Sequence, residues 1–155
     1  MSTRPDRASR PTRADYVAWR TVTTRWRDDD AYGHLNNATY YEMFDTAVNA
    51  HLYEASGVDV RSLPQIGVVA ETSCRYFREI GFPAPVETGL VVDRVGTSSV
   101  VYRIGLFQGD GAEAAAEGRF VHVYVDNTDP ARGVTPIPDV IRAAVEPLLR
   151  VGGDQ

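Results

Sequence analysis

Apolar side chains recur along the chain with two different periods, and the change of period separates one long helix from a set of strands. Between residues 38 and 56 the apolar positions are three or four residues apart, which is typical of a helix that buries one face. Asn36 or Asn37 suits the beginning of this helix as a cap, and Gly57 suits its end. The apolar stripe consists of Tyr40, Phe44, Ala47, Val48, His51, Leu52 and Ala55.

Most of the other segments are rich in β-branched and aromatic residues, which favours strands. The alternation of two faces is clearest in the segment that contains Phe120, His122 and Tyr124. Each of these three residues is followed by a valine. Gly-containing breaks at 95–97 and 108–111 predict hairpin turns. The predicted strands span residues 16–27, 66–77, 86–95, 98–107 and 114–126, and a short amphipathic helix is predicted over 140–149.

The order of these elements is a strand, a long helix, four strands and a short helix, which indicates an α+β fold rather than a doubly wound sheet. We expect residues 16–150 to form a single domain. Residues 1–15 contain four Arg among Ser, Thr and Pro with little to bury, so we expect a disordered tail there. One helix covers only one face of a single sheet, and we therefore expect the other face or an edge to meet a second copy of the chain.

The composition is that of an ordinary soluble protein of 155 residues, 24% charged and 43% hydrophobic. Its 16 basic residues are all Arg, and the net charge of -5 disfavours nucleic-acid binding through bulk electrostatics.

With one Cys and three His, a cysteine-cluster zinc site is excluded and we expect no metal site. No apolar run approaches the about 20 residues of a membrane span, and no signal-peptide pattern opens the chain, so we expect a cytoplasmic protein that does not enter a membrane.

Three consecutive carboxylates, Asp28, Asp29 and Asp30, lie directly before the long helix. The beginning of a helix offers backbone N–H groups without partners and the positive end of the helix dipole, which can polarise a carbonyl or hold an oxyanion. A carboxylate beside such donors can act as a nucleophile or a general base in acyl transfer. The same residues also suit turns and helix caps, so the residues alone leave a catalytic and a purely structural interpretation open.

One segment resembles a known family. Residues 26–45 read WRDDDAYGHLNNATYYEMFD. They resemble acyl-CoA thioesterases of the 4-hydroxybenzoyl-CoA thioesterase group, whose pattern is a D-x-D-x-x-G loop, often H-V-N-N, and then an aromatic-rich helix. Leu35 stands where the family usually has Val. Residues 116–126 resemble the family's last long strand, and the resemblance covers residues 16–125.

The resemblance implies the hotdog fold, in which a five-stranded antiparallel sheet is wrapped around one long central helix, here with a short C-terminal helix added. It also implies an acyl-CoA thioesterase that forms homodimers or homotetramers, with each site at a subunit interface. Asp30 falls on the family's catalytic carboxylate and would be the nucleophile or general base. The oxyanion donors would be backbone N–H groups of residues 36–38, above all that of Asn37. Some relatives use the His and first Asn of H-V-N-N directly, and here these are His34 and Asn36. Some bacterial relatives have a His where this chain has Asn37, which disfavours a mechanism that needs that His.

The resemblance implies that CoA contacts the turn that carries Arg94, Thr97, Ser98 and Ser99, with a plain solvated hairpin as the alternative. Arg75 is a candidate for phosphate or an ordinary surface charge. Candidates for the acyl group, with structural roles as the alternative, are Tyr32, Gly33, Tyr41, Val69, Glu71 and Thr72. No cofactor is implied, because the CoA moiety belongs to the substrate. An acyl carrier protein is an alternative carrier, and neither the length nor the aromaticity of the acyl group follows from the sequence.

Two alternative functions share much of this pattern. A non-catalytic acyl-CoA-binding protein of the same fold would keep the loop and the helix. A hydratase of the same fold would carry D-x-N-x-x-H, but the matching positions are Asp29, Ala31 and His34, so the Asn is absent. The sequence therefore favours thioester hydrolysis over hydration.

Overall fold

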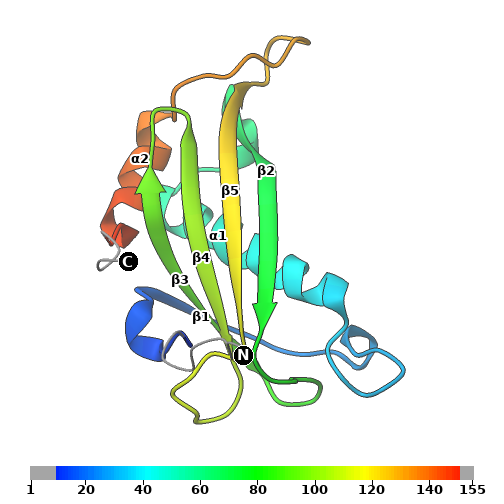
Figure 1. Ribbon diagram of the computed structural model, residues 1–155. Helices are drawn as coiled ribbons and strands as arrows, with labels where there is room; N and C mark the ends of the chain where they lie inside the picture. Colours follow the sequence, from blue (N-terminus) through cyan, green and yellow to red (C-terminus); the bar gives the residue numbers. More distant parts are fainter. Residues whose placement is uncertain (1–9, 151–155) are drawn as a thin grey trace, which may run out of the picture.

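The computed structural model describes residues 10–150 and contains one five-stranded antiparallel sheet (Figure 1). Its strands are β1 (Ala18–Val22), β2 (Gln65–Tyr76), β3 (Val86–Val95), β4 (Ser99–Phe107) and β5 (Ala116–Asp126), in the spatial order β1-β3-β4-β5-β2. All four strand pairs are antiparallel. The predicted α+β class and the five-stranded antiparallel sheet are therefore confirmed.

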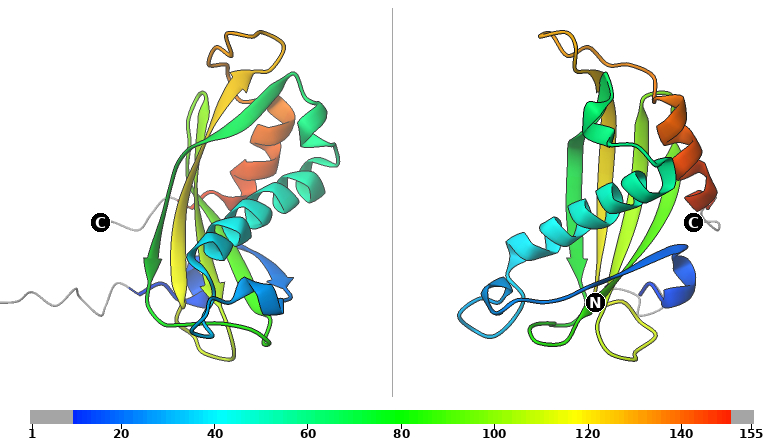
Figure 2. Two further views of the ribbon diagram at one scale, coloured as in Figure 1. Left: turned by 90° about the vertical axis from the view of Figure 1, so that its right-hand side faces the viewer. Right: turned by 180° about the vertical axis from the view of Figure 1, so that it is seen from behind.

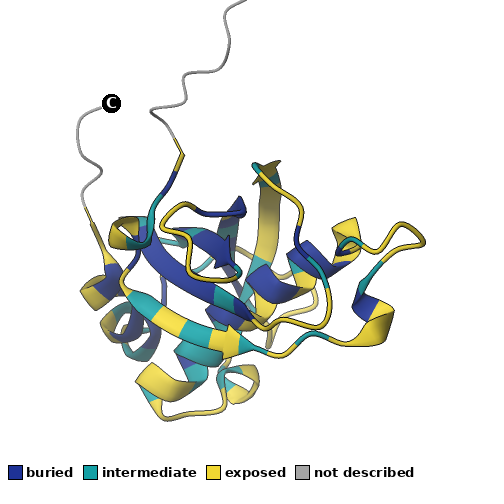
Figure 3. Cartoon of the chain, turned by 90° about the horizontal axis from the view of Figure 1, so that it is seen from below, coloured by how far each residue is buried: buried dark blue, intermediate teal, exposed yellow. Residues whose placement is uncertain are grey.

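The long helix α1 (Asn37–Ser56) runs diagonally across one face of this sheet (Figure 2). Its buried apolar residues share one core cluster with residues of the strands. Buried segments of the chain are dark blue in Figure 3. Phe44 packs directly on the backbone of β5, because a side chain at Gly118 would overlap the Phe44 ring. This close approach fixes where the helix crosses the sheet.

The helix ends follow the local chemistry that the sequence predicts. Asn36 caps the beginning of α1, since its Oδ1 accepts a hydrogen bond from the Ala38 N–H at 3.0 Å. Gly57 ends the helix in the left-handed conformation, with φ of 71°. The second helix, α2 (Asp139–Val145), packs beside the C-terminal half of α1, where the Ala144 carbonyl accepts a hydrogen bond from His51 Nε2 at 2.9 Å.

The sheet face away from α1 has a smaller cluster around Tyr16. The Tyr16 ring lies on the backbone of Gly105, where no side chain would fit. Its hydroxyl donates a hydrogen bond to Glu117, a buried carboxylate that also forms ion pairs with Arg75 at 3.1 Å and Arg103 at 3.3 Å. Because both carboxylate oxygens of Glu117 are met by a partner, its burial is tolerated.

Several predicted boundaries differ from the structure. The predicted strand over 16–27 is only five residues long and is followed by a 3-10 turn, Trp26–Asp28, because the Asp28 carboxylate holds the backbone of Arg25 in a capped turn. The predicted C-terminal helix over 140–149 divides into α2 and a 3-10 turn, Glu146–Leu148, with Pro147 at the division. The segment at 108–111 belongs to a longer connection from β4 to β5 rather than a tight hairpin.

Part of the predicted tail contacts the rest of the chain. Residues 1–9 lie outside the described residues, but residues 10–15 are held against the connection between β4 and β5. The Arg13 backbone N–H donates to the Ala112 carbonyl at 3.0 Å, and the Arg13 guanidinium lies 4.8 Å from the centre of the Phe107 ring. Backbone pairing and this cation–π contact order a segment that its composition alone marked as a tail.

One long strand of the sheet has a free edge. β2 pairs only with β5 among the described strands, and its 12 residues are all half-buried or exposed. Exposed edge strands of this length offer a row of unpaired backbone groups to another strand. No helix within residues 10–150 is both long and apolar enough to cross a membrane.

Candidate active site

The three consecutive carboxylates before α1 have three different partners. Asp28 is buried, and its Oδ2 accepts the Arg25 backbone N–H at 2.7 Å while its Oδ1 accepts the Arg25 guanidinium at 2.9 Å. Burial by itself raises the pKa of Asp28, but the hydrogen bonds from Arg25 outweigh it and hold the pKa below its ordinary value. Asp28 is therefore a structural carboxylate.

Asp29 connects the loop to the segment that follows β2. Its Oδ1 and Oδ2 accept the Phe82 backbone N–H at 3.1 and 3.3 Å. Beside it, the Leu35 backbone N–H donates to the Ile80 carbonyl at 2.7 Å. These bonds fix one end of the loop and leave the next carboxylate to face outward.

Asp30 is exposed and is held by the loop itself. Its Oδ1 accepts hydrogen bonds from the backbone N–H groups of Tyr32 at 2.8 Å and His34 at 3.2 Å. Gly33 supports this tight turn with a φ of 78°, which is the left-handed region that glycine adopts readily. The Oδ2 atom of Asp30 makes no hydrogen bond to any residue in the described part of the chain, so this oxygen is free to act on a ligand.

The beginning of α1 leaves one backbone donor unused. The Asn36 N–H donates to the Asp28 carbonyl at 2.8 Å, and the Ala38 N–H donates to the Asn36 side chain at 3.0 Å. Between them, the Asn37 N–H has no hydrogen-bond partner among residues 10–150. It is therefore the donor at this positive helix end that could meet an oxyanion.

Asp30, His34 and Asn37 border one cleft of about 370 Å³. The opposite wall comes from the end of β2 and the residues after it, where Glu79 Oε2 lies 2.9 Å from His34 Nε2. The remaining lining residues are Leu35, Tyr40, Tyr76, Phe77 and Arg78. Of the four predicted catalytic residues, the structure brings these three to the cleft, whereas the Asn36 side chain is occupied as the helix cap.

The predicted acyl contacts divide between two faces of β2. Tyr41, Val69 and Thr72 line a groove of about 570 Å³ between α1 and β2. Glu71 instead forms an ion pair with Arg119 at 2.8 Å on the other face. The cause is a bulge between Val69 and Glu71, because one extra residue reverses the alternation of faces. Tyr32 is 84% exposed at the tip of the loop.

The predicted CoA contacts lie apart from Asp30 within one chain. Thr97 and Ser98 lie in the turn between β3 and β4, with Arg94 near the end of β3 and Ser99 at the beginning of β4, at the opposite end of the sheet from the loop (Figure 1). This turn is held to the segment before α2, where the Ile137 N–H donates to the Thr97 carbonyl at 2.9 Å. Arg75 pairs with Glu117 on the face away from α1.

Six residues that line the cleft, Glu79 and Tyr76 among them, were not predicted as site residues from the sequence. Glu79 and Tyr76 come from the end of β2 and the residues after it, and only the pairing of loop and strand brings them to the beginning of α1. Tyr76 packs edge-on against Tyr40 of the helix, with ring centres 4.9 Å apart. No local pattern in the sequence marks either residue. Within residues 10–150, no group of three or more His, Cys, Asp and Glu side chains is placed to hold a metal ion.

Comparison with known proteins identifies the family. The model of the thioesterase-like superfamily matches residues 24–145, which include the loop, α1 and the four long strands. The chain belongs to the thioesterase-like superfamily. The resemblance stated on residues 26–45 is thereby confirmed. No curated protein matches the chain.

Solved structures of other proteins have the same fold. The PA5185 protein of Pseudomonas aeruginosa is 45% identical, with a TM-score of 0.85 over 90% of this chain and 96% of that chain. The PA2801 protein of the same organism, described as a candidate thioesterase, is 32% identical, with a TM-score of 0.71 over 81% and 95% of the two chains. A thioesterase of Thermus thermophilus, complexed with coenzyme A and Zn, is 26% identical, with a TM-score of 0.69 over 84% and 92%.

Proposed function

We propose that this protein hydrolyses the thioester of an acyl-CoA to a free acid and CoA. Family membership supports a thioester hydrolase, and a similar thioesterase with coenzyme A bound supports CoA as the thiol half of the substrate. The observation that carries the proposal is that one cleft contains two available groups. One is the Oδ2 atom of Asp30, and the other is the backbone N–H of Asn37, which donates to no described residue.

Each group has a separate task in this reaction. The thioester carbonyl oxygen would accept the Asn37 N–H, so that the positive end of α1 stabilises the negative charge that develops on this oxygen. Asp30 would attack the carbonyl carbon to give an acyl-enzyme anhydride that water then cleaves, or it would take a proton from an attacking water. In both routes the carbon–sulfur bond breaks and the thiolate of CoA leaves. Thiolate is a good leaving group, so no strong general acid is required, and the proposal includes no metal or cofactor.

His34 would assist from the side of the cleft. Its Nε2 lies 2.9 Å from Glu79 Oε2, and both residues line the same cleft as Asp30. A His oriented by a carboxylate is suited to move a proton at a reacting oxygen or water. Asn36 would act through the helix cap, by holding the N-terminal amides in position.

We further propose that two chains complete the site by pairing their β2 edges. The exposed edge of β2 and the adjoining groove with Tyr41, Val69 and Thr72 favour such a pairing. Antiparallel pairing brings the end of β2 in one chain beside the beginning of β2 in the other. The β3–β4 turn of the second copy, which carries Arg94 and Ser99 in this chain's numbering, would then lie at the Asp30 end and could meet the phosphates of CoA.

The test is release of free thiol from a panel of acyl-CoAs and acyl carrier protein thioesters by the purified protein at catalytic concentration. The proposal predicts multiple turnovers on at least one acyl-CoA. Saturable CoA binding without thiol release from any thioester would contradict hydrolysis and favour the non-catalytic binding protein. Light scattering of the same sample tests the pairing, which predicts a mass of at least two chains.

A further inference from the structure

A groove continues from the candidate active site along α1. Asn37 and Tyr40 line the cleft that contains Asp30. The next residue along the helix in each case, Ala38 or Tyr41, lines a groove of about 570 Å³ between α1 and β2. An acyl group whose thioester oxygen is held by the Asn37 N–H would therefore extend into this groove.

The floor of the groove is mostly apolar. Val69 of β2 is 47% exposed there, beside the buried ring of Phe120 from β5. Tyr41 and Thr72 stand on the two sides, one on α1 and the other on β2. A surface of this kind gains from being covered by an aliphatic or aromatic group, which is what most acyl chains supply.

Two carboxylates stand along the helix side of this floor. Among the described residues that line the groove, Glu42 and Asp45 alone are charged. They are three positions apart on α1, so they lie on the same face of the helix. Counted from Asn37, they are about 7.5 and 12 Å along the helix axis. Glu42 is therefore beside the middle of a bound acyl chain, and Asp45 is beside its far end.

Neither carboxylate is neutralised by a close cation. Glu42 Oε2 is 4.0 Å from the Arg25 guanidinium, which is bound more closely to Asp28, at 2.9 Å. Asp45 forms no ion pair within residues 10–150, and its Oδ1 accepts only the neutral side-chain amide of Asn49, at 3.1 Å. The helix side of the groove is therefore negative.

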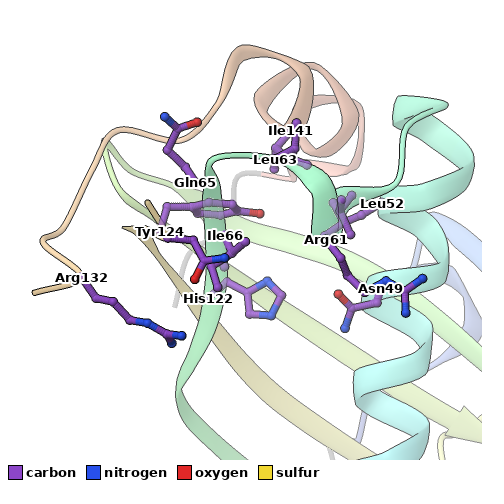
Figure 4. Close-up of a pocket in the computed structure, with 13 residues that line it drawn as sticks. Asn49, Leu52, Arg61, Leu63, Gln65, Ile66, His122, Tyr124, Arg132 and Ile141 are labelled. Atoms are coloured by element: carbon purple, nitrogen blue, oxygen red, sulfur yellow. The ribbon is translucent and has the colours of Figure 1, made fainter. Parts of the chain in front are cut away.

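This negative lining is a property of the groove and does not follow from the net charge of -5 alone. The cavity at the other end of α1, shown in Figure 4, has a comparable volume of about 340 Å³. Two cations, Arg61 and Arg132, are among its lining residues, on opposite sides of His122, and no described Asp or Glu lines it. Acidic side chains thus gather at the hollow that adjoins Asp30 and are absent from the lining of the other.

We propose that Glu42 and Asp45 determine acyl specificity by excluding acyl groups that carry a carboxylate at the far end. The substrates are then acyl-CoAs whose acyl group has no negative charge, an inference that rests on the proposed thioester hydrolysis. A carboxylate in the groove would lose water on the apolar floor and would be repelled by two like charges. Repulsion of this kind gives specificity without any new attractive contact. In the pair of chains proposed above, the second copy would cover the groove and strengthen the repulsion, since less water would separate the charges.

The test compares two thioethers of CoA that cannot be hydrolysed. One is S-octyl-CoA, and in the other the terminal methyl group of the octyl chain is replaced by a carboxylate. Calorimetric titration of the full chain should give a Kd about tenfold higher for the carboxylate, because each repulsion is worth about threefold even in water. Raising the ionic strength from about 0.1 M to about 1 M should reduce this ratio, since the screening length falls from about 10 Å to about 3 Å.

Isosteric substitutions assign the discrimination to these side chains. Glu42→Gln and Asp45→Asn should each lower the ratio of the two Kd values by about threefold, and the double variant should remove most of it. The matched control is Glu54→Gln, which changes an exposed Glu of the same helix that pairs with Arg20 outside the groove. This control should leave the ratio unchanged.

Equal affinity of the wild-type chain for the two thioethers would overturn the proposal, as would the absence of saturable binding by either. It would also be overturned by a preference for S-octyl-CoA that persists in the double variant. Thiol release from octanoyl-CoA and suberoyl-CoA separates this inference from the proposed function. If neither thioester is cleaved but the thioethers are discriminated, hydrolysis fails and the specificity of the groove stands. If both thioesters are cleaved with the same kcat/KM, hydrolysis stands and the specificity fails.

Discussion

Asp30 and His34 are joined by two hydrogen bonds of opposite direction. The Asp30 N–H donates to the His34 carbonyl at 2.7 Å, and the His34 N–H donates to the Asp30 carboxylate at 3.2 Å. This reciprocal pair closes a five-residue loop and fixes the direction of the Asp30 side chain before any substrate arrives. Because the carboxylate is held by one oxygen only, the other oxygen is both oriented and available.

The neighbouring Asp28 predicts an effect of acid on stability. Its pKa is lower in the folded chain than its ordinary value of 3.8, so ionised Asp28 stabilises the fold above that pH, and the contribution is lost as the pH falls through the lowered pKa. Asp28→Asn should reduce the free energy of unfolding by about 2 kcal/mol at neutral pH. In urea titrations, the gap between wild type and variant should shrink below pH 3.8. A gap that does not change with pH would show that the charge of Asp28 is unimportant.

His122 predicts a separate effect at milder pH. Its pKa is about 4 in the folded chain, against an ordinary value of 6.5, so the unfolded chain binds a proton that the folded chain does not between these values. The free energy of unfolding should therefore fall by about 1 kcal/mol per pH unit as the pH decreases from 6.5 toward 4. His122→Phe should flatten this slope in the same measurement. An equally steep slope in the variant would assign the effect to other groups.

Two substitutions of the capping residue Asn36 distinguish a structural role from a chemical one. Asn36→Ala removes the acceptor for the Ala38 N–H and should destabilise the protein by about 1 kcal/mol, measured by urea denaturation. Asn36→Ser keeps a capping oxygen and should retain both stability and most thioesterase activity. If Asn36→Ser folds normally but loses activity as severely as Asp30→Asn, the Asn36 amide itself contacts the substrate.

The contact of Phe44 with Gly118 predicts a strict requirement for glycine. Gly118→Ala forces a methyl group into the Phe44 ring and should cost about 1 to 3 kcal/mol in the free energy of unfolding. The matched control is Gly111→Ala, because a Cβ there lies 3.9 Å from its nearest neighbour, an atom of Arg78. This control should change stability by less than about 0.5 kcal/mol. Equal effects of the two substitutions would show that α1 can shift on the sheet.

Sequence reasoning succeeded where one local pattern decides the structure. The periodicity of α1, its cap and its end at Gly57 are local patterns. Each was predicted, and the structure selects Asn36 from the two predicted capping residues, Asn36 and Asn37. The cleft was only partly predictable, because Glu79 and Tyr76 reach it through strand pairing that the sequence does not display. Glu71, expected beside Val69 and Thr72, lies on the other face of β2, since a single-residue bulge reverses the alternation.

The central claim is that Asp30, and not its neighbours, performs the chemistry. The most direct test is the ratio of kcat/KM for thioester hydrolysis between Asp30→Asn and Asp29→Asn, two isosteric changes at adjacent positions. Asn at position 30 can still accept the Tyr32 and His34 N–H groups, so the loop should persist while activity falls by a factor of about 100 to 10,000. Asp29→Asn should keep activity within a few-fold of wild type. Comparable activity in the two variants, with both folded, would contradict the account.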